Sequence, residues 1–293
     1  MSWEFWEEGK IMSGATPPEQ QFHPMSVSQV LDRTFRLYRG HFLRFMAIAC
    51  VVYVPAGLLQ AVAVPFLNFS LQSGRAGPGL GVAAAVASLV TAFLMMLAQS
   101  LCTGALTRAV SETYLGRDIT VKGAYTSVLP VFPTMILAGI LVGLVVFVGF
   151  LLLIVPGVIF SLWFALVMPA IIVERSGPTE AMGRSKSLVG GNLGRVFLVS
   201  LVVGVIGWVA GGAAGLVSVG IASLMPENLF LLQQAIQQLL SLGARIAVAP
   251  IGAAAFILLY YDLRIRKEGF DLEMLADQMK RETEESRDHP PAP

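Results

Sequence analysis

The sequence has 293 residues, of which 55% are hydrophobic and only 13% are charged, and its formal net charge is +1. Soluble domains carry about 25% charged residues, so this composition excludes an ordinary soluble domain and indicates an integral membrane protein. A net charge this close to zero gives no general attraction to nucleic acid, and no nucleic-acid partner is expected.

The chain begins with an acidic and aromatic segment, MSWEFWEEGK, that lacks the basic start and apolar centre of a cleaved signal peptide. We therefore expect residues 1–25 to form a disordered tail. The next segment predicts an amphipathic helix over residues 26–42, because Ser26 and Gln29 have the spacing of a capping box. One face of this helix is apolar and the other carries three arginines, as in helices that lie on a membrane surface. The basic face consists of Arg33, Arg36 and Arg39.

Six apolar segments have the length and hydropathy of membrane spans. The third and fourth are separated only by Pro156-Gly157, within a stretch from residue 123 to residue 173 that has no Asp, Glu, Lys or Arg. One helix over that stretch is far longer than the bilayer core, which is about 30 Å thick, so the proline-glycine pair predicts a hairpin tip. The expected spans are residues 44–66, 82–107, 133–153, 157–173, 196–223 and 244–263.

The basic residues predict the orientation of these spans. Fourteen arginines and lysines flank the ends that would lie on the side of the two chain termini, and only Arg75 lies in a loop on the other side. Cytoplasmic loops carry such an excess, so we expect a multi-pass membrane protein with both termini in the cytoplasm; in a bacterial cell this is the inner membrane.

Two polar features interrupt the spans. In the second span, Gln99, Thr103 and Thr107 recur at four-residue intervals, which predicts either a polar path or interhelical hydrogen bonds. At the start of the sixth span lies Arg245, which follows a segment rich in glutamine. An arginine inside a membrane is a candidate functional residue; alternatively, its side chain extends to the outer interface.

A shift of 151 residues places four residues on identical ones: Arg33 on Arg184, Leu37 on Leu188, Gly40 on Gly191 and Arg44 on Arg195. This pattern indicates a duplicated unit in which a surface helix precedes a membrane hairpin. A weaker third copy begins near Thr120. The repeats would enter the membrane from the same side and so be parallel. The alternative is that each span independently requires arginines before it.

The residues that carry chemistry are sparse. The three histidines lack the spacing of metal ligands, and no motif of a nucleophile or a phosphate-binding loop is present. Three acids, Glu112, Glu174 and Asp262, lie near span ends, where we expect pairing with neighbouring arginines: Arg175 for Glu174, and Arg264 and Arg266 for Asp262. The sequence therefore predicts no cofactor and no enzymatic activity.

Three segments, together with residues 26–42, carry a family resemblance. They are IVPGVIFSLWFALVMPAIIVE (154–174), EAMGRSKSLVGGNLGRVF (180–197) and LLYYDLRIRKEGFDLE (258–273). Over about residues 26–275 the chain resembles the bacterial glycerophosphoryl diester phosphodiesterase membrane domain. The resemblance implies only the helical membrane part of such proteins, without the catalytic barrel. Phosphodiesterase activity is not implied, because the sequence contains no His-Arg-Gly start of the catalytic barrel to which such membrane parts can be fused.

The overall prediction is an all-α polytopic membrane bundle with about six transmembrane helices and cytoplasmic amphipathic helices. Its six-span domain covers residues 26–268, and residues 269–293 are expected to form another amphipathic helix and a disordered tail. The expected function is a non-enzymatic scaffold or accessory protein whose basic helices bind anionic lipid headgroups; the alternative is a transporter of small solutes or lipids. The predicted headgroup ligands are Arg33, Arg36, Arg39, Arg184, Lys186, Arg195, Arg264 and Arg266.

Overall fold

The computed structural model describes residues 25–72 and 78–268, and every regular element in those residues is a helix. Six helical segments are long and apolar enough to cross a membrane, which confirms the predicted helical membrane bundle. The chain divides into two compact units, Ser26–Tyr260 and a smaller one formed by the chain on either side of it. The predicted tails and the loop at residues 73–77 lie outside the described residues.

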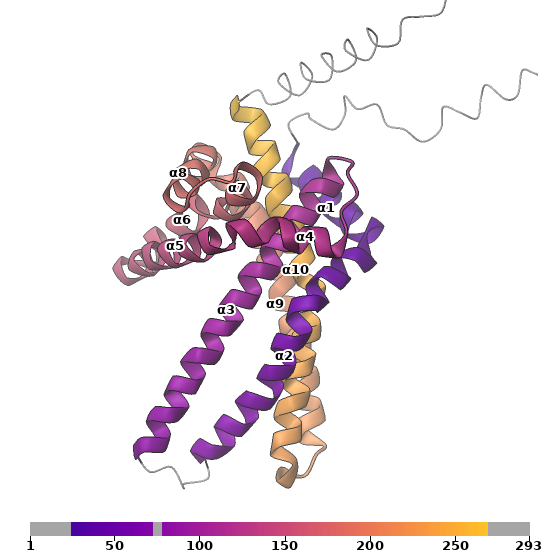
Figure 1. Cartoon of the computed structure of the whole chain (residues 1–293), viewed down its shortest axis with the longest axis vertical. Helices are drawn as coiled ribbons and strands as arrows, with labels where there is room; N and C mark the ends of the chain where they lie inside the picture. The colour runs from indigo at the N-terminus through magenta and orange to yellow at the C-terminus, as the bar shows by residue number, and fades with distance from the viewer. Residues whose placement is uncertain (1–24, 73–77, 269–293) are drawn as a thin grey trace, which may run out of the picture. The chain divides into compact units, whose positions relative to one another are not determined.

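The first helix, α1 (Val27–Gly40), begins at the predicted capping box, in which Ser26 and Gln29 bond to each other's backbone N–H. It leads into α2 (Phe42–Gln72), which packs along α3 (Pro78–Tyr114) (Figure 1). The short helix α4 (Val121–Val128) and a 3-10 turn then lead to α5 (Phe132–Leu152). These helices supply the first three candidate spans.

The fourth candidate span is not one helix, because α6 (Ile154–Trp163) and α7 (Val167–Glu174) are separated by a turn. Ser185, on α8 (Pro178–Val189), fills this break: its hydroxyl donates to the Trp163 carbonyl at 2.6 Å and accepts the Leu166 N–H at 3.1 Å. A buried backbone N–H that the helix cannot pair is thus satisfied by a side chain. The chain ends with α9 (Leu193–Ser223), a 3-10 turn and α10 (Phe230–Glu268).

The hairpin between the third and fourth spans is present, but its tip is not the proline-glycine pair. Leu153 alone breaks the helix with an extended backbone (φ −167°, ψ 157°), and Pro156 lies in the first turn of α6, where a missing N–H costs nothing. Gly157 serves packing instead, since a Cβ on Gly149 of α5 would lie 3.0 Å from the Gly157 Cα. The predicted tip was therefore wrong by about three residues.

The helix bounds favour the predicted duplication. α1 and α8 begin at residues 27 and 178, and α2 and α9 begin at 42 and 193, so that both differences are 151. Independent spans that each require arginines do not explain why the short and the long helix both start at this offset. The repeated unit is thus a short helix, a long helix and a returning helix.

The short helices also bury corresponding positions. Four and eight residues after the N-cap, each has an almost fully buried side chain: Val30 and Thr34 in α1, Ala124 and Val128 in α4, and Ala181 and Ser185 in α8. This i, i+4 pair lies on one face of a helix. The third copy, which the sequence indicated only weakly, shares this pattern.

Within Ser26–Tyr260, the core lies where the helices meet the arginine-rich segments. Fully buried side chains include Phe45 and Ile48 of α2, Leu106 of α3 and Leu258 of α10. The far halves of the same helices expose apolar side chains such as Leu89 and Leu216, as expected where the solvent is hydrocarbon. The predicted spans are therefore well packed at one end and open to lipid at the other.

The smaller unit holds the chain on both sides of the bundle together. Met25 donates its N–H to Asp262 Oδ1 at 2.6 Å, and Arg266 donates to the Met25 carbonyl at 2.7 Å. Arg266 also pairs with Asp262, at 3.1 Å, and Arg264 pairs with Glu268, at 3.1 Å. Asp262 is fully buried, and these contacts satisfy its charge.

Candidate functional site

Arg245 lies within the open half of the bundle and not at the start of its helix. α10 begins at Phe230, 15 residues earlier, so about 22 Å of helix precede Arg245. The prediction that placed Arg245 at the outer start of the sixth span was therefore wrong, because the glutamine-rich segment that precedes it is part of the same helix. Its side chain does not reach that end of α10.

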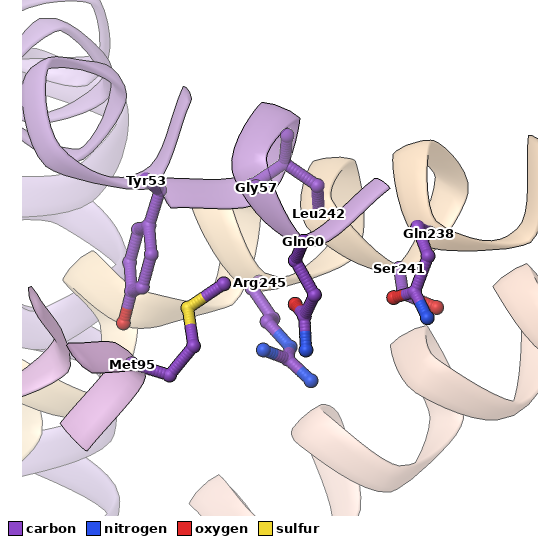
Figure 2. Close-up of a pocket in the computed structure, with 8 residues that line it drawn as sticks. All are labelled: Tyr53, Gly57, Gln60, Met95, Gln238, Ser241, Leu242 and Arg245. Atoms are coloured by element: carbon purple, nitrogen blue, oxygen red, sulfur yellow. The ribbon is translucent and has the colours of Figure 1, made fainter. Parts of the chain in front are cut away.

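A small cavity beside Arg245 has a volume of about 10 Å³, which is room for about one water molecule. Figure 2 shows the Arg245 guanidinium and the Gln60 amide pointing the same way, with Tyr53 and Met95 to one side of them and Gln238 and Ser241 to the other. Three helices supply these groups: α2, α3 and α10. The immediate surroundings of the guanidinium are thus uncharged and only partly polar, since Met95 and Leu242 also line the cavity.

A larger groove adjoins this cavity on the side of α9. Its volume is about 520 Å³, and it is an open groove and not an enclosed pocket. The residues that line it are Tyr53, Gln99, Gly207, Gly211, Ser241, Ala244, Arg245, Val248 and Ala249.

The groove brings together only part of the predicted polar path. Gln99 and Arg245 both line it, whereas Thr103 is half-buried and does not line it, and Thr107 is buried in the core. The predicted polar residues of α3 run from the groove into the packed end of the bundle. Gln99 therefore lines the groove, whereas the residues one and two turns further on lie against or within the core. Neither cavity is lined by an aspartate or glutamate.

Among the residues that the structure describes, Arg245 has no hydrogen-bond or ion-pair partner. Other arginines do have carboxylate partners: Arg108 with Glu112 at 2.7 Å and Arg184 with Glu174 at 2.9 Å in the same unit, and Arg266 with Asp262 in the smaller one. A charge inside the membrane is costly unless it is paired or solvated. A guanidinium that lines a groove without a carboxylate can bind an anion through its parallel N–H donors.

The predicted headgroup ligands separate into two groups. Arg184, Arg264 and Arg266 are bound in ion pairs, Arg33 stacks over the Tyr114 ring at 5.0 Å, and Lys186 lies 4.7 Å from the centre of the Trp163 ring. Arg36 and Arg39 are exposed on α1, and Arg195 is partly exposed. The structure gives the first group roles within the fold, which the distribution of charge along the sequence does not reveal.

The acids at the span ends are paired, as expected, but partly with other arginines. Glu174 pairs with Arg184 and not with Arg175, because α8 runs back along α7, and it also accepts a hydrogen bond from the Tyr260 hydroxyl. Asp262 pairs with Arg266, one helical turn further on, as expected. In the described ranges, no three or more His, Cys, Asp or Glu side chains gather as a candidate metal site.

The sequence alone did not predict which residues line the cavity with Arg245, namely Tyr53, Gln60 and Ser241. A signal for some of them exists, since Gln238, Ser241 and Arg245 are separated by three and four residues and so share a face of α10. No sequence pattern predicts that α2 lines the groove, because only the packing of α2 against α3 and α10 places Tyr53 there.

The chain belongs to a family defined by the domain of unknown function DUF7847, whose model matches residues 25–263. No curated protein and no solved structure matches the chain. The match covers all six candidate spans almost completely and includes both cavities, so the family describes the whole helical bundle. The resemblance to the glycerophosphoryl diester phosphodiesterase membrane domain stays a prediction.

Proposed function

We propose that this chain is a polytopic membrane protein that binds a ligand with an anionic group at Arg245, in the manner of a solute- or lipid-handling permease. One observation carries the proposal: a guanidinium without a carboxylate partner lines a groove of about 520 Å³. The surrounding amide and hydroxyl groups of Gln60, Gln99 and Ser241 can donate further hydrogen bonds to an anion. We assign no catalytic residue.

The test measures anion binding by the full chain purified in an uncharged detergent. Inorganic phosphate and dioleoyl phosphatidic acid in mixed micelles are titrated separately by calorimetry into wild type, Arg245→Gln and Arg175→Gln. Arg175→Gln is the matched control, because it removes the same charge from an exposed position that lines neither cavity. We expect Arg245→Gln to weaken the binding of at least one probe by about tenfold or more, since hydrogen bonds to charged groups contribute about 1.5–3 kcal/mol. Equal binding by Arg245→Gln and wild type rejects the proposal.

A second candidate function is a scaffold whose α1 helix binds anionic headgroups. Arg36 and Arg39 favour it, because both are exposed on the polar face of α1, and each basic residue near a membrane surface contributes about 1 kcal/mol toward anionic lipid. The same titrations distinguish the two functions. Loss of phosphatidic acid binding in an Arg36→Gln/Arg39→Gln double variant, with Arg245→Gln unaffected, supports the scaffold.

We also propose that the protein resides in a bacterial inner membrane with both termini in the cytoplasm. The support is the uneven distribution of arginine and lysine among the loops. The parallel order of the repeated units is consistent with it, because each unit then begins on the same side of the membrane.

A further inference from the structure

The polar lining of the groove continues along α10 toward the start of that helix. Gln234, Gln238, Ser241 and Arg245 follow one another at spacings of four, three and four residues, which places them on one face of the helix. The track that they form, here called the α10 track, is about 16 Å long at 1.5 Å per residue. Its last two residues line the groove.

The other end of the α10 track opens into a separate cavity of about 110 Å³ between α9 and α10. Gln234 lines this cavity together with Gln237 and Ser218. Gln233 also lines it and donates its amide to the carbonyls of Ala222 and Met225, at 3.3 and 3.4 Å, and so fixes the connection between the two helices. Polar side chains therefore follow one another along α10 from this cavity to Arg245.

The groove extends about one turn beyond Arg245, to Val248 and Ala249, and is then closed by the core. Along α10 the residues that follow become buried, with Ile251 8% exposed and Ala254 fully buried. On α3, Gln99 is followed by Cys102 and Leu106, both fully buried. A polar group that reaches Arg245 along the α10 track therefore cannot move further through the core. The track is open only at the start of α10.

Part of the groove lining is apolar, here called the apolar wall. It consists of Gly207 and Gly211 of α9 and of Ala244 and Val248 of α10, and α9 exposes Val209 and Leu216 nearby along the helix. A small inorganic anion would contact Arg245 and leave this apolar wall uncovered. A molecule with an anionic group and a hydrocarbon chain matches both the charge and the apolar wall.

We propose that the ligand at Arg245 is an anionic amphiphile with a phosphate or carboxylate group, which enters at the start of α10. Its anionic group passes along the α10 track and pairs with Arg245, while its hydrocarbon part lies in the groove beside Gly211. This inference rests on the proposed function, because it specifies what carries the anion. A free phosphate shares the same chemistry at Arg245 but does not use the apolar wall.

Two adjacent glycines of α9 provide the test. A Cβ at either Gly211 or Gly212 would meet no atom within 4 Å, but only Gly211 lines the groove. Gly211→Leu and the matched control Gly212→Leu are purified as full chains and titrated with dioleoyl phosphatidic acid and with inorganic phosphate. We expect Gly211→Leu to weaken phosphatidic acid binding by about tenfold, since about 1.4 kcal/mol of lost contact corresponds to that factor, and Gly212→Leu to bind as wild type.

The outcomes separate this inference from the proposed function. If phosphate binds in an Arg245-dependent way and Gly211→Leu leaves phosphatidic acid binding unchanged, the amphiphile is rejected and an anion site remains. If Arg245→Gln changes neither probe, both proposals fail. Should Gly211→Leu not yield folded protein, Ala244→Leu fills the same groove from α10 and is judged by the same criteria.

Discussion

At the scale of single residues, the structure distinguishes arginines that hold the fold from an arginine that is available to a ligand. Arg184 and Arg245 both carry a full positive charge near apolar helices, and hydropathy treats them alike. The difference lies in their neighbours: Arg184 bonds to Glu174 through its Nε at 2.9 and 3.1 Å, whereas the groove around Arg245 has no carboxylate. Function is therefore assigned by partners and not by residue type.

The Glu174 carboxylate joins α7, α8 and α10, because it accepts hydrogen bonds from Arg184 and from the Tyr260 hydroxyl. Glu174→Gln removes the negative charge that accepts from both Arg184 and Tyr260, and we expect a loss of about 1.5–3 kcal/mol in stability. Asp118→Asn is the control, because Asp118 pairs with Arg44 but its side chain is 92% exposed, and exposed pairs contribute about 0–1 kcal/mol. Thermal unfolding in detergent measures both. Equal melting temperatures for the two variants would show that Glu174 is not a structural junction.

At the scale of helices, the sequence predicted where helices exist better than where they break. Six spans were expected and six are found, since apolar length is read directly from the chain. The break between α6 and α7 was missed, because it depends on the Ser185 hydroxyl, which is 19 residues from the Leu166 N–H that it satisfies. A break stabilised by a distant side chain leaves no local pattern.

The turn between α5 and α6 shows the same limit. Pro156-Gly157 is a strong turn signal in isolation, yet proline is also favoured in the first turn of a helix, and the structure uses it there. Position 157 requires a glycine because α6 lies in close contact with α5 there. Local residue preference therefore fixed the hairpin to within a few residues, and packing decided its tip.

Two glycines of α5 test this packing. A Cβ on Gly149 would lie 2.7 Å from the Phe160 ring and 3.0 Å from the Gly157 Cα, whereas one on Gly143 would meet nothing within 4 Å. We expect Gly149→Ala to destabilise the protein by about 1–3 kcal/mol through overpacking. Gly143→Ala should be neutral or stabilising by up to about 1 kcal/mol, because alanine favours a helix. Thermal melts of the two variants give the comparison, and similar shifts would contradict a close α5–α6 contact.

At the scale of the whole chain, the repeat accounts for features that the spans do not explain singly. A common offset of 151 residues relates the starts of α1 and α2 to those of α8 and α9, and the buried pair on α4 extends the pattern to a middle unit. Four identical residues were enough to suggest the duplication. The candidate site was only partly predictable, because the copies have diverged at Arg245, whose equivalent at the 151-residue offset is Leu94.

Parallel units require that α1, α4 and α8 lie on one side of the membrane and that the start of α10 lies on the other. The prediction is tested with single cysteines after Cys50 and Cys102, which form no disulfide, are replaced by alanine. An impermeant maleimide should label Gln237→Cys, at the cavity near the start of α10, in right-side-out membrane vesicles only. It should label Arg39→Cys, on the exposed face of α1, in inverted vesicles only.

The same labelling constrains the site, because the α10 track begins beside Gln237 and is closed beyond Arg245 by fully buried core residues such as Ala254 and Leu106. If Arg39→Cys and Gln237→Cys are labelled from the same side, the helices between them do not cross the membrane as parallel units, and an entry restricted to one side loses its basis. If they are labelled from opposite sides, an amphiphile reaches Arg245 only from the leaflet that faces away from the arginine-rich helices. The fixed positive charge would then bind its anionic group at the inner end of a path that does not continue to the other side.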